Sequence, residues 1–150
     1  MIKKQCGYTL VEMLISLAIM GLVFVIAGTA IYQLSTASDY GNDRLKAVND
    51  LQKAAFWFNR DGKAAQDAKA KGNKELTLTL SGNEVIVYRQ IGNTLERVDE
   101  NASMVLVENI GDLRFKVQKS TLNMDLTTII SGRMEDSVQG SYTVFMRSGQ

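Results

Sequence analysis

Residues 1–31 read MIKKQCGYTLVEMLISLAIMGLVFVIAGTAI, and this stretch decides how the rest of the chain is organised. Two lysines precede a glycine, and a long apolar run follows it. Between Tyr8 and Ser38 the only charged side chain is Glu12. A charge in hydrocarbon is costly, and such residues usually have a function and a partner. Glu12 is therefore a candidate functional residue.

The apolar run is long enough to cross a membrane. No charged residue occurs from Met13 to Ile31, and that length is close to the ~20 residues that a spanning helix needs. Lys3 and Lys4 precede the span, which places the N-terminus in the cytoplasm and the residues after Ile31 outside. We therefore expect residues 8–34 to form a transmembrane helix in the cytoplasmic (inner) membrane and residues 35–150 to form a domain outside the cytoplasm.

The helix is predicted to continue beyond the membrane. The chain contains no proline, and apolar side chains recur at steps of three and four through Leu45, Val48, Leu51, Ala55 and Phe58. This pattern predicts one helix from Tyr8 to about Ala68, weakest near Gly41 and Gly62. Its second half is amphipathic, so one face must be buried against another element.

That element is predicted to be an antiparallel sheet. Alternating or β-rich segments separated by turn signals occur at Leu76–Leu80, Val85–Arg89, Leu95–Val98, Met104–Val107, Leu113–Val117 and Tyr142–Met146. Residues 119–139 are the least regular; Met124–Ile130 reads as a strand and Ser131–Gly140 as a polar loop. A long helix on an antiparallel sheet is an α+β fold.

Composition argues against most enzymatic chemistry. The chain has no histidine and its one cysteine is Cys6, so Cys/His zinc sites are not expected. The carboxylates of Asp61, Asp67, Asp99, Glu100 and Asp112 are scattered and read as solvated surface, although a calcium site in a loop stays open. We expect no catalytic residue, no cofactor and no metal.

Charge gives no support to general nucleic-acid binding, which needs a basic surface. The whole chain carries 17 Lys and Arg against 16 Asp and Glu. Without Lys3 and Lys4 the balance becomes 15 against 16, a net charge of −1.

The head of the chain resembles the cleavage motif of the type IV pilin and pseudopilin family. The resemblance rests on Lys3 and Lys4 and on the run Gly7-Tyr8-Thr9-Leu10-Val11-Glu12. Tyr8 stands where phenylalanine is commonest in that family, and the proline that is common further along the helix is missing. The motif covers about the first 31 residues, whereas the remainder matches only in plan.

The resemblance implies a pilin-like fold and a structural role. A prepilin peptidase, which is also the methyltransferase, would remove the leader 1–7 by cutting between Gly7 and Tyr8 and would N-methylate Tyr8. Glu12 would then pair with the N-terminal amine of a neighbouring subunit during assembly. Other implied partners are further pilins or minor pseudopilins and the inner-membrane assembly platform.

Within the family, the segment from Leu51 to Asp61 followed by short strands is most like minor pilins or J-type minor pseudopilins, with a role in starting or capping assembly. Pilus, type II secretion and DNA-uptake filaments all fit this pattern.

Two other functions stay open on the sequence. Ser35-Thr36-Ala37 resembles a signal-peptidase site, which would make the chain a secreted binding protein starting at Ser38. A signal-anchored surface protein without a filament would keep Met1. On charge alone, Glu12 also has a simpler interpretation, in which it reaches the headgroups or pairs with the amine of its own Tyr8.

Overall fold

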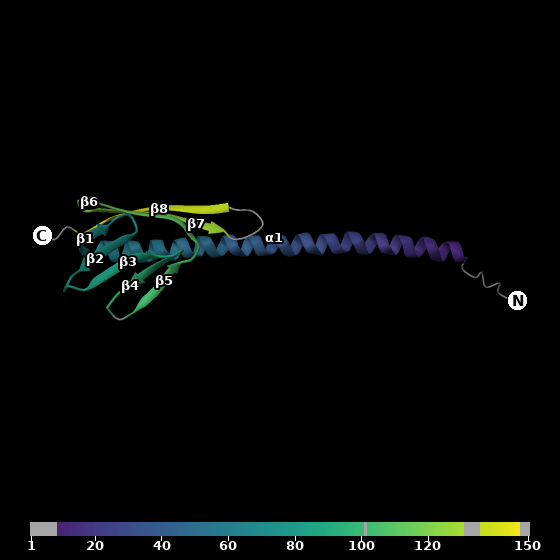
Figure 1. Ribbon diagram of the computed structural model, residues 1–150, viewed down its shortest axis with the longest axis horizontal. Helices are drawn as coiled ribbons and strands as arrows, with labels where there is room; N and C mark the ends of the chain where they lie inside the picture. Colours follow the sequence, from purple (N-terminus) through teal and green to yellow (C-terminus); the bar gives the residue numbers. More distant parts are fainter. Residues whose placement is uncertain (1–8, 101, 131–135, 148–150) are drawn as a thin grey trace. The chain divides into compact units, whose positions relative to one another are not determined.

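The described residues form one long helix and eight strands (Figure 1). The computed structural model describes residues 9–100, 102–130 and 136–147. Helix α1 runs from Leu10 to Ala64, so the predicted long helix is confirmed. The chain divides into two units, one ending at Asp39 and one running from Tyr40. Helix α1 contributes to both, and all eight strands belong to the second.

The strands form two antiparallel sheets. The first has the order β1-β2-β3-β4-β5 and the second the order β6-β7-β8. The bounds are β1 (Ala65–Lys71), β2 (Glu75–Leu80), β3 (Val85–Ile91), β4 (Thr94–Val98), β5 (Ser103–Val107), β6 (Ile110–Gln118), β7 (Thr121–Ile130) and β8 (Asp136–Phe145). The α+β architecture is thus confirmed, with the sheet divided in two.

In the strands, the alternation of residues seen in the sequence matches an alternation of buried and less buried side chains. In β7 every second residue is buried: Leu122, Met124, Leu126, Thr128 and Ile130. The turn signals also hold, because Gly92 adopts a φ of 56° in the two-residue connection between β3 and β4. A glycine fits this left-handed conformation without steric cost.

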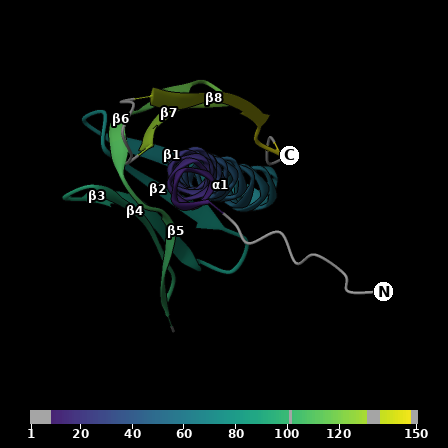
Figure 2. The same ribbon diagram turned by 90° about the vertical axis from the view of Figure 1, so that its right-hand side faces the viewer.

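The core lies between the two sheets and the C-terminal part of α1. Figure 2 shows the two sheets on different sides of the helix. Three aromatic rings meet at its centre, those of Phe58, Tyr88 and Phe115, with centroids 6.2–6.3 Å apart. The buried face of α1 consists mainly of Ala47, Leu51, Ala54 and Phe58. Its small residues let the strands approach the helix closely.

Four details of the sequence prediction are wrong. The helix ends at Ala64 rather than Ala68, because the following residues pair with β2 as strand β1. Leu45 is exposed and Ala47 is buried, so the inward face is rotated from the expected one. Residues 136–140 belong to β8 rather than to a loop. Asp61 is buried, as described below; the rest of the expected loop, 131–135, lies outside the described residues.

Candidate functional site

Thr9 and Glu12 close the first turn of α1 in a reciprocal cap. The Thr9 N–H donates to Glu12 Oε2 at 2.9 Å, and the Thr9 hydroxyl donates to the same oxygen at 3.1 Å. In return the Glu12 N–H donates to Thr9 Oγ1 at 3.3 Å. This is the capping box of a Thr-x-x-Glu sequence, in which each side chain satisfies the other residue's backbone N–H. Glu12 therefore has a structural role in the helix start.

The cap leaves part of the Glu12 carboxylate available. Both hydrogen bonds end on Oε2, and within the described residues Oε1 accepts none. A carboxylate has about four lone-pair sites. Glu12 can therefore keep its cap and still accept a donor from another chain.

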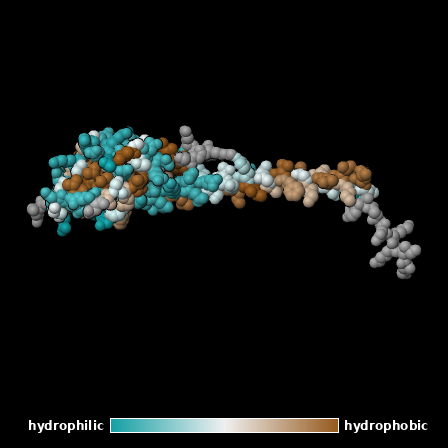
Figure 3. Space-filling view, turned by 60° about the horizontal axis from the view of Figure 1, so that its bottom comes forward, coloured by the Kyte–Doolittle hydropathy of each residue, from teal (hydrophilic) through white to brown (hydrophobic). Residues whose placement is uncertain are grey.

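The helix around Glu12 exposes apolar side chains on every face. Large apolar residues from Leu10 to Leu34 are all at least half exposed, and Figure 3 shows hydrophobic surface along this part of the helix. Polar side chains within it bond to their own backbone: Ser16 to the Glu12 carbonyl, Thr29 to Ile26 and Thr36 to Tyr32. By length and composition this helix could cross a membrane. These hydroxyl groups find their hydrogen-bond acceptors within the helix, as polar groups must where no water is present.

The predicted cleavage and methylation residues, Gly7 and Tyr8, lie outside the described residues. The structure therefore places only Glu12 among the predicted site residues. The role of Thr9 was not predicted from the sequence, although its spacing of three from Glu12 is the signal for a capping box.

A buried polar cluster lies in the second unit, at the last turns of α1. Asp61 is 3% exposed and accepts hydrogen bonds from Arg97 Nε at 2.7 Å and from the Tyr88 hydroxyl at 2.6 Å. Arg97 also donates to Asp99 at 2.7 Å. Burial, together with the Asp61 carboxylate, raises the pKa of Tyr88 far above its ordinary range. The hydroxyl therefore stays protonated and donates to Asp61.

The Trp57 ring extends this cluster toward the surface. The guanidinium carbons of Arg97 and Arg60 lie 4.7 and 4.9 Å from its centroid, within cation–π range. The cluster joins α1 to β3 and β4 and reads as a structural connection. The expectation that Asp61 is a solvated surface carboxylate is therefore wrong, whereas Asp67 and Asp112 are exposed as expected.

In the described ranges, no three His, Cys, Asp or Glu side chains are grouped so that they could hold a metal ion.

Comparison with known proteins identifies one segment of the chain. Residues 2–28 match the family model described as the prokaryotic N-terminal methylation motif. Neither the curated proteins nor the solved structures give a match. The matched segment contains Glu12 and the start of α1. It supports a precursor of the type IV pilin or pseudopilin type, and it points to a structural subunit rather than an enzyme.

Proposed function

We propose that this chain is a minor subunit of a type IV pilus-like or secretion filament, with a role in starting or capping assembly. The observation that carries the proposal is the motif match over residues 2–28, joined to a helix whose apolar half is exposed on every face. Such a surface must be covered by lipid before assembly and by neighbouring helices after it.

Processing follows from the same segment. A prepilin peptidase of the inner membrane removes residues 1–7 by cutting between Gly7 and Tyr8, and Tyr8 is N-methylated. Residues 8–34 then anchor the subunit, and residues 35–150 lie outside the cytoplasm. Cleavage on the cytoplasmic side leaves the anchor in place, unlike removal of a signal peptide.

Glu12 directs assembly in this proposal. Cleavage creates an α-amine at Tyr8, and in apolar surroundings a carboxylate attracts it more strongly than in water. Since Oε2 serves the cap to Thr9, Oε1 is the atom that accepts from the amine of an adjacent subunit. Helix association in lipid gains little from hydrophobicity, so this pair contributes strongly to the register between helices.

The test must separate the charge of Glu12 from its cap. Glu12→Gln keeps a capping-box acceptor but removes the charge. Thr9→Val keeps the charge but removes the hydroxyl that accepts from the Glu12 N–H and donates to Glu12 Oε2. We expect Glu12→Gln to be cleaved and inserted normally but to co-purify poorly with partner pilins. Thr9→Val should co-purify nearly as well as the unaltered chain.

Two results would count against this role. Normal co-purification of Glu12→Gln would exclude the charge pair as the determinant of assembly. A defect in Thr9→Val as large as that in Glu12→Gln would assign the effect to the helix start instead.

A further inference from the structure

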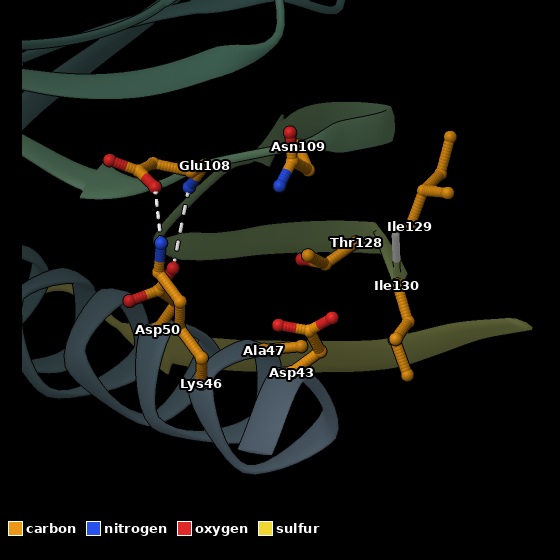
Figure 4. Close-up of a pocket in the computed structure, with 9 residues that line it drawn as sticks. All are labelled: Asp43, Lys46, Ala47, Asp50, Glu108, Asn109, Thr128, Ile129 and Ile130. Atoms are coloured by element: carbon orange, nitrogen blue, oxygen red, sulfur yellow. Dashed lines mark hydrogen bonds and ion pairs between the residues drawn. The ribbon is translucent and has the colours of Figure 1, made fainter. Parts of the chain in front are cut away.

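A small polar hollow lies in the second unit, where α1, the turn between β5 and β6, and β7 meet (Figure 4). Its volume is about 60 Å³. Asp43, Lys46, Ala47 and Asp50 line it from α1, Glu108 and Asn109 from the turn, and Thr128, Ile129 and Ile130 from β7.

The hollow carries an excess of negative charge. It has three carboxylates, those of Asp43, Asp50 and Glu108, against the one ammonium of Lys46. Lys46 Nζ donates to Glu108 Oε2 at 2.7 Å. The Glu108 N–H donates to Asp50 Oδ2 at 3.5 Å. In the part of the chain that the structure describes, the Asp43 carboxylate forms no hydrogen bond or ion pair. Two carboxylates therefore remain without a neutralising cation there.

The pKa of Lys46 is shifted in the direction that an excess of negative charge produces. The pKa of Lys46 is raised, first by its hydrogen bond and charge interaction with Glu108, and further by the charges of Asp50 and Asp43. A positive group in this position is therefore favoured by all three carboxylates.

A buried hydroxyl faces the same space without a partner. Thr128 is 2% exposed, and among the described residues its Oγ1 has no hydrogen-bond partner. Figure 4 shows its side chain extending toward the space above Asp43. The other inward residues of β7 are apolar, so a valine could fill this position without burying an unsatisfied polar atom. The hydroxyl thus indicates a ligand that hydrogen-bonds to it.

We propose that this hollow binds the head of one organic cation, an alkylammonium or a guanidinium. Its N–H groups donate to Thr128 Oγ1 and to Asp43, and its charge offsets the excess of carboxylates. The space accommodates about four water-sized groups, which is the size of such a head. A metal ion fits less well, because the three carboxylates of the hollow are not grouped so that they could hold one together, and the described residues contain no other such group.

Two sources supply this chemistry, a lysine or arginine side chain of another polypeptide and a free polyamine. The inference rests on the second unit alone and does not depend on the proposed filament role.

The test is a titration of the full-length chain in detergent micelles, followed by the NMR signals of the Ala47 and Ile130 methyl groups. The probes are ethylammonium and ethylguanidinium chloride, with sodium chloride at equal ionic strength as the reference. We expect saturable shifts with at least one probe. Thr128→Val and Asp43→Asn should each weaken that binding about tenfold or more, because the first removes an acceptor for the charged head and the second removes the carboxylate charge from its hydrogen bond.

Matched variants guard against indirect effects. Glu84→Gln removes an exposed carboxylate in the β2–β3 turn and should leave binding unchanged. Thr128→Val should unfold at the same or a higher temperature than the unaltered chain, which shows that weakened binding is not unfolding.

The source of the bound cation is identified by comparing the affinities of spermidine and of acetylated lysine and arginine amides. Tighter binding of spermidine indicates a free polyamine, and tighter binding of an amide indicates a protein side chain. The absence of saturable shifts, binding that neither Thr128→Val nor Asp43→Asn weakens, or saturation by calcium at a lower concentration than by the organic cations would overturn the proposal.

Discussion

At the scale of single residues, the carboxylates of Glu12 and Asp61 have different surroundings: Glu12 caps the start of α1, and Asp61 is buried in an ion pair with Arg97. Glu12 stands out because no other charge occurs between Tyr8 and Ser38, a fact that the sequence itself contains. Asp61 pairs with Arg97 and Tyr88, which lie 36 and 27 positions further along the chain. No local pattern reveals such a pairing, so a buried carboxylate looked like a surface one.

Asp61→Asn should destabilise the fold strongly. Asparagine can still accept from Tyr88, but Arg97 loses one of its two carboxylates while remaining buried. Removing one partner of a buried ion pair typically costs ~3–5 kcal/mol. Because Asp99 remains, we expect a loss near the lower end in the free energy of unfolding, measured by chemical denaturation.

Asp67→Asn is the matched control for this substitution. Asp67 is exposed, and its ion pair with Lys69, at 3.6 Å, is also exposed, so the change should stay within about 0.5 kcal/mol. Equal effects of the two substitutions would show that the Asp61 cluster adds no particular stability.

A second prediction at this scale concerns pH. The Tyr40 hydroxyl donates to Asp136 at 2.8 Å, and this bond, with the Ser137 N–H, holds the pKa of Asp136 below its ordinary value. A lowered folded-state pKa contributes stability above the unfolded-state pKa, and that stability is lost as the pH falls through the folded-state pKa. Tyr40→Phe should raise the pKa of Asp136, as followed by NMR titration of its carboxyl carbon. An unchanged pKa would mean that the Tyr40 bond is not formed in solution.

At the scale of elements, the alternation of apolar and polar residues predicted most of the strands, and β1 is the exception. In a chain without proline, the helix was predicted to continue to about Ala68, which lies inside strand β1. The alanines and lysines of β1 do favour helices. Pairing with β2, from Ala65 opposite Leu80 to Lys71 opposite Glu75, overrides that preference. The division into two sheets is likewise set by pairing between strands, which a single sequence does not show.

Two glycines of α1 give a prediction about packing. A Cβ on Gly62 would lie 2.9 Å from Val144 Cγ1 and 3.2 Å from Leu122 Cδ1, whereas one on Gly41 would meet no atom of the described residues within 4 Å. Gly62→Ala should therefore destabilise the protein by about 1–3 kcal/mol through overpacking. Gly41→Ala should stabilise it by roughly 0.5–1 kcal/mol, because alanine favours a helix.

Thermal unfolding of both variants checks this prediction. An increase in stability for Gly62→Ala equal to that for Gly41→Ala would show that β8 does not pack against the helix as closely as described.

At the scale of the whole molecule, the chain consists of an apolar helical segment and a domain with its own core. The domain buries Phe58, Tyr88 and Phe115 at its centre, whereas the segment up to Leu34 leaves its large apolar side chains exposed. That exposed surface has no use in a secreted soluble protein. It suits a membrane-anchored segment, with which the motif at residues 2–28 is consistent.

The N-terminus of the mature chain tests this account most directly. The chain is produced in membranes with a prepilin peptidase, and its N-terminal peptide is identified by mass spectrometry, with Gly7→Leu as the uncut control. The account predicts a chain that begins at N-methylated Tyr8, and an intact precursor for Gly7→Leu. A chain that begins at Ser38, or one that keeps Met1 despite the peptidase, would contradict it.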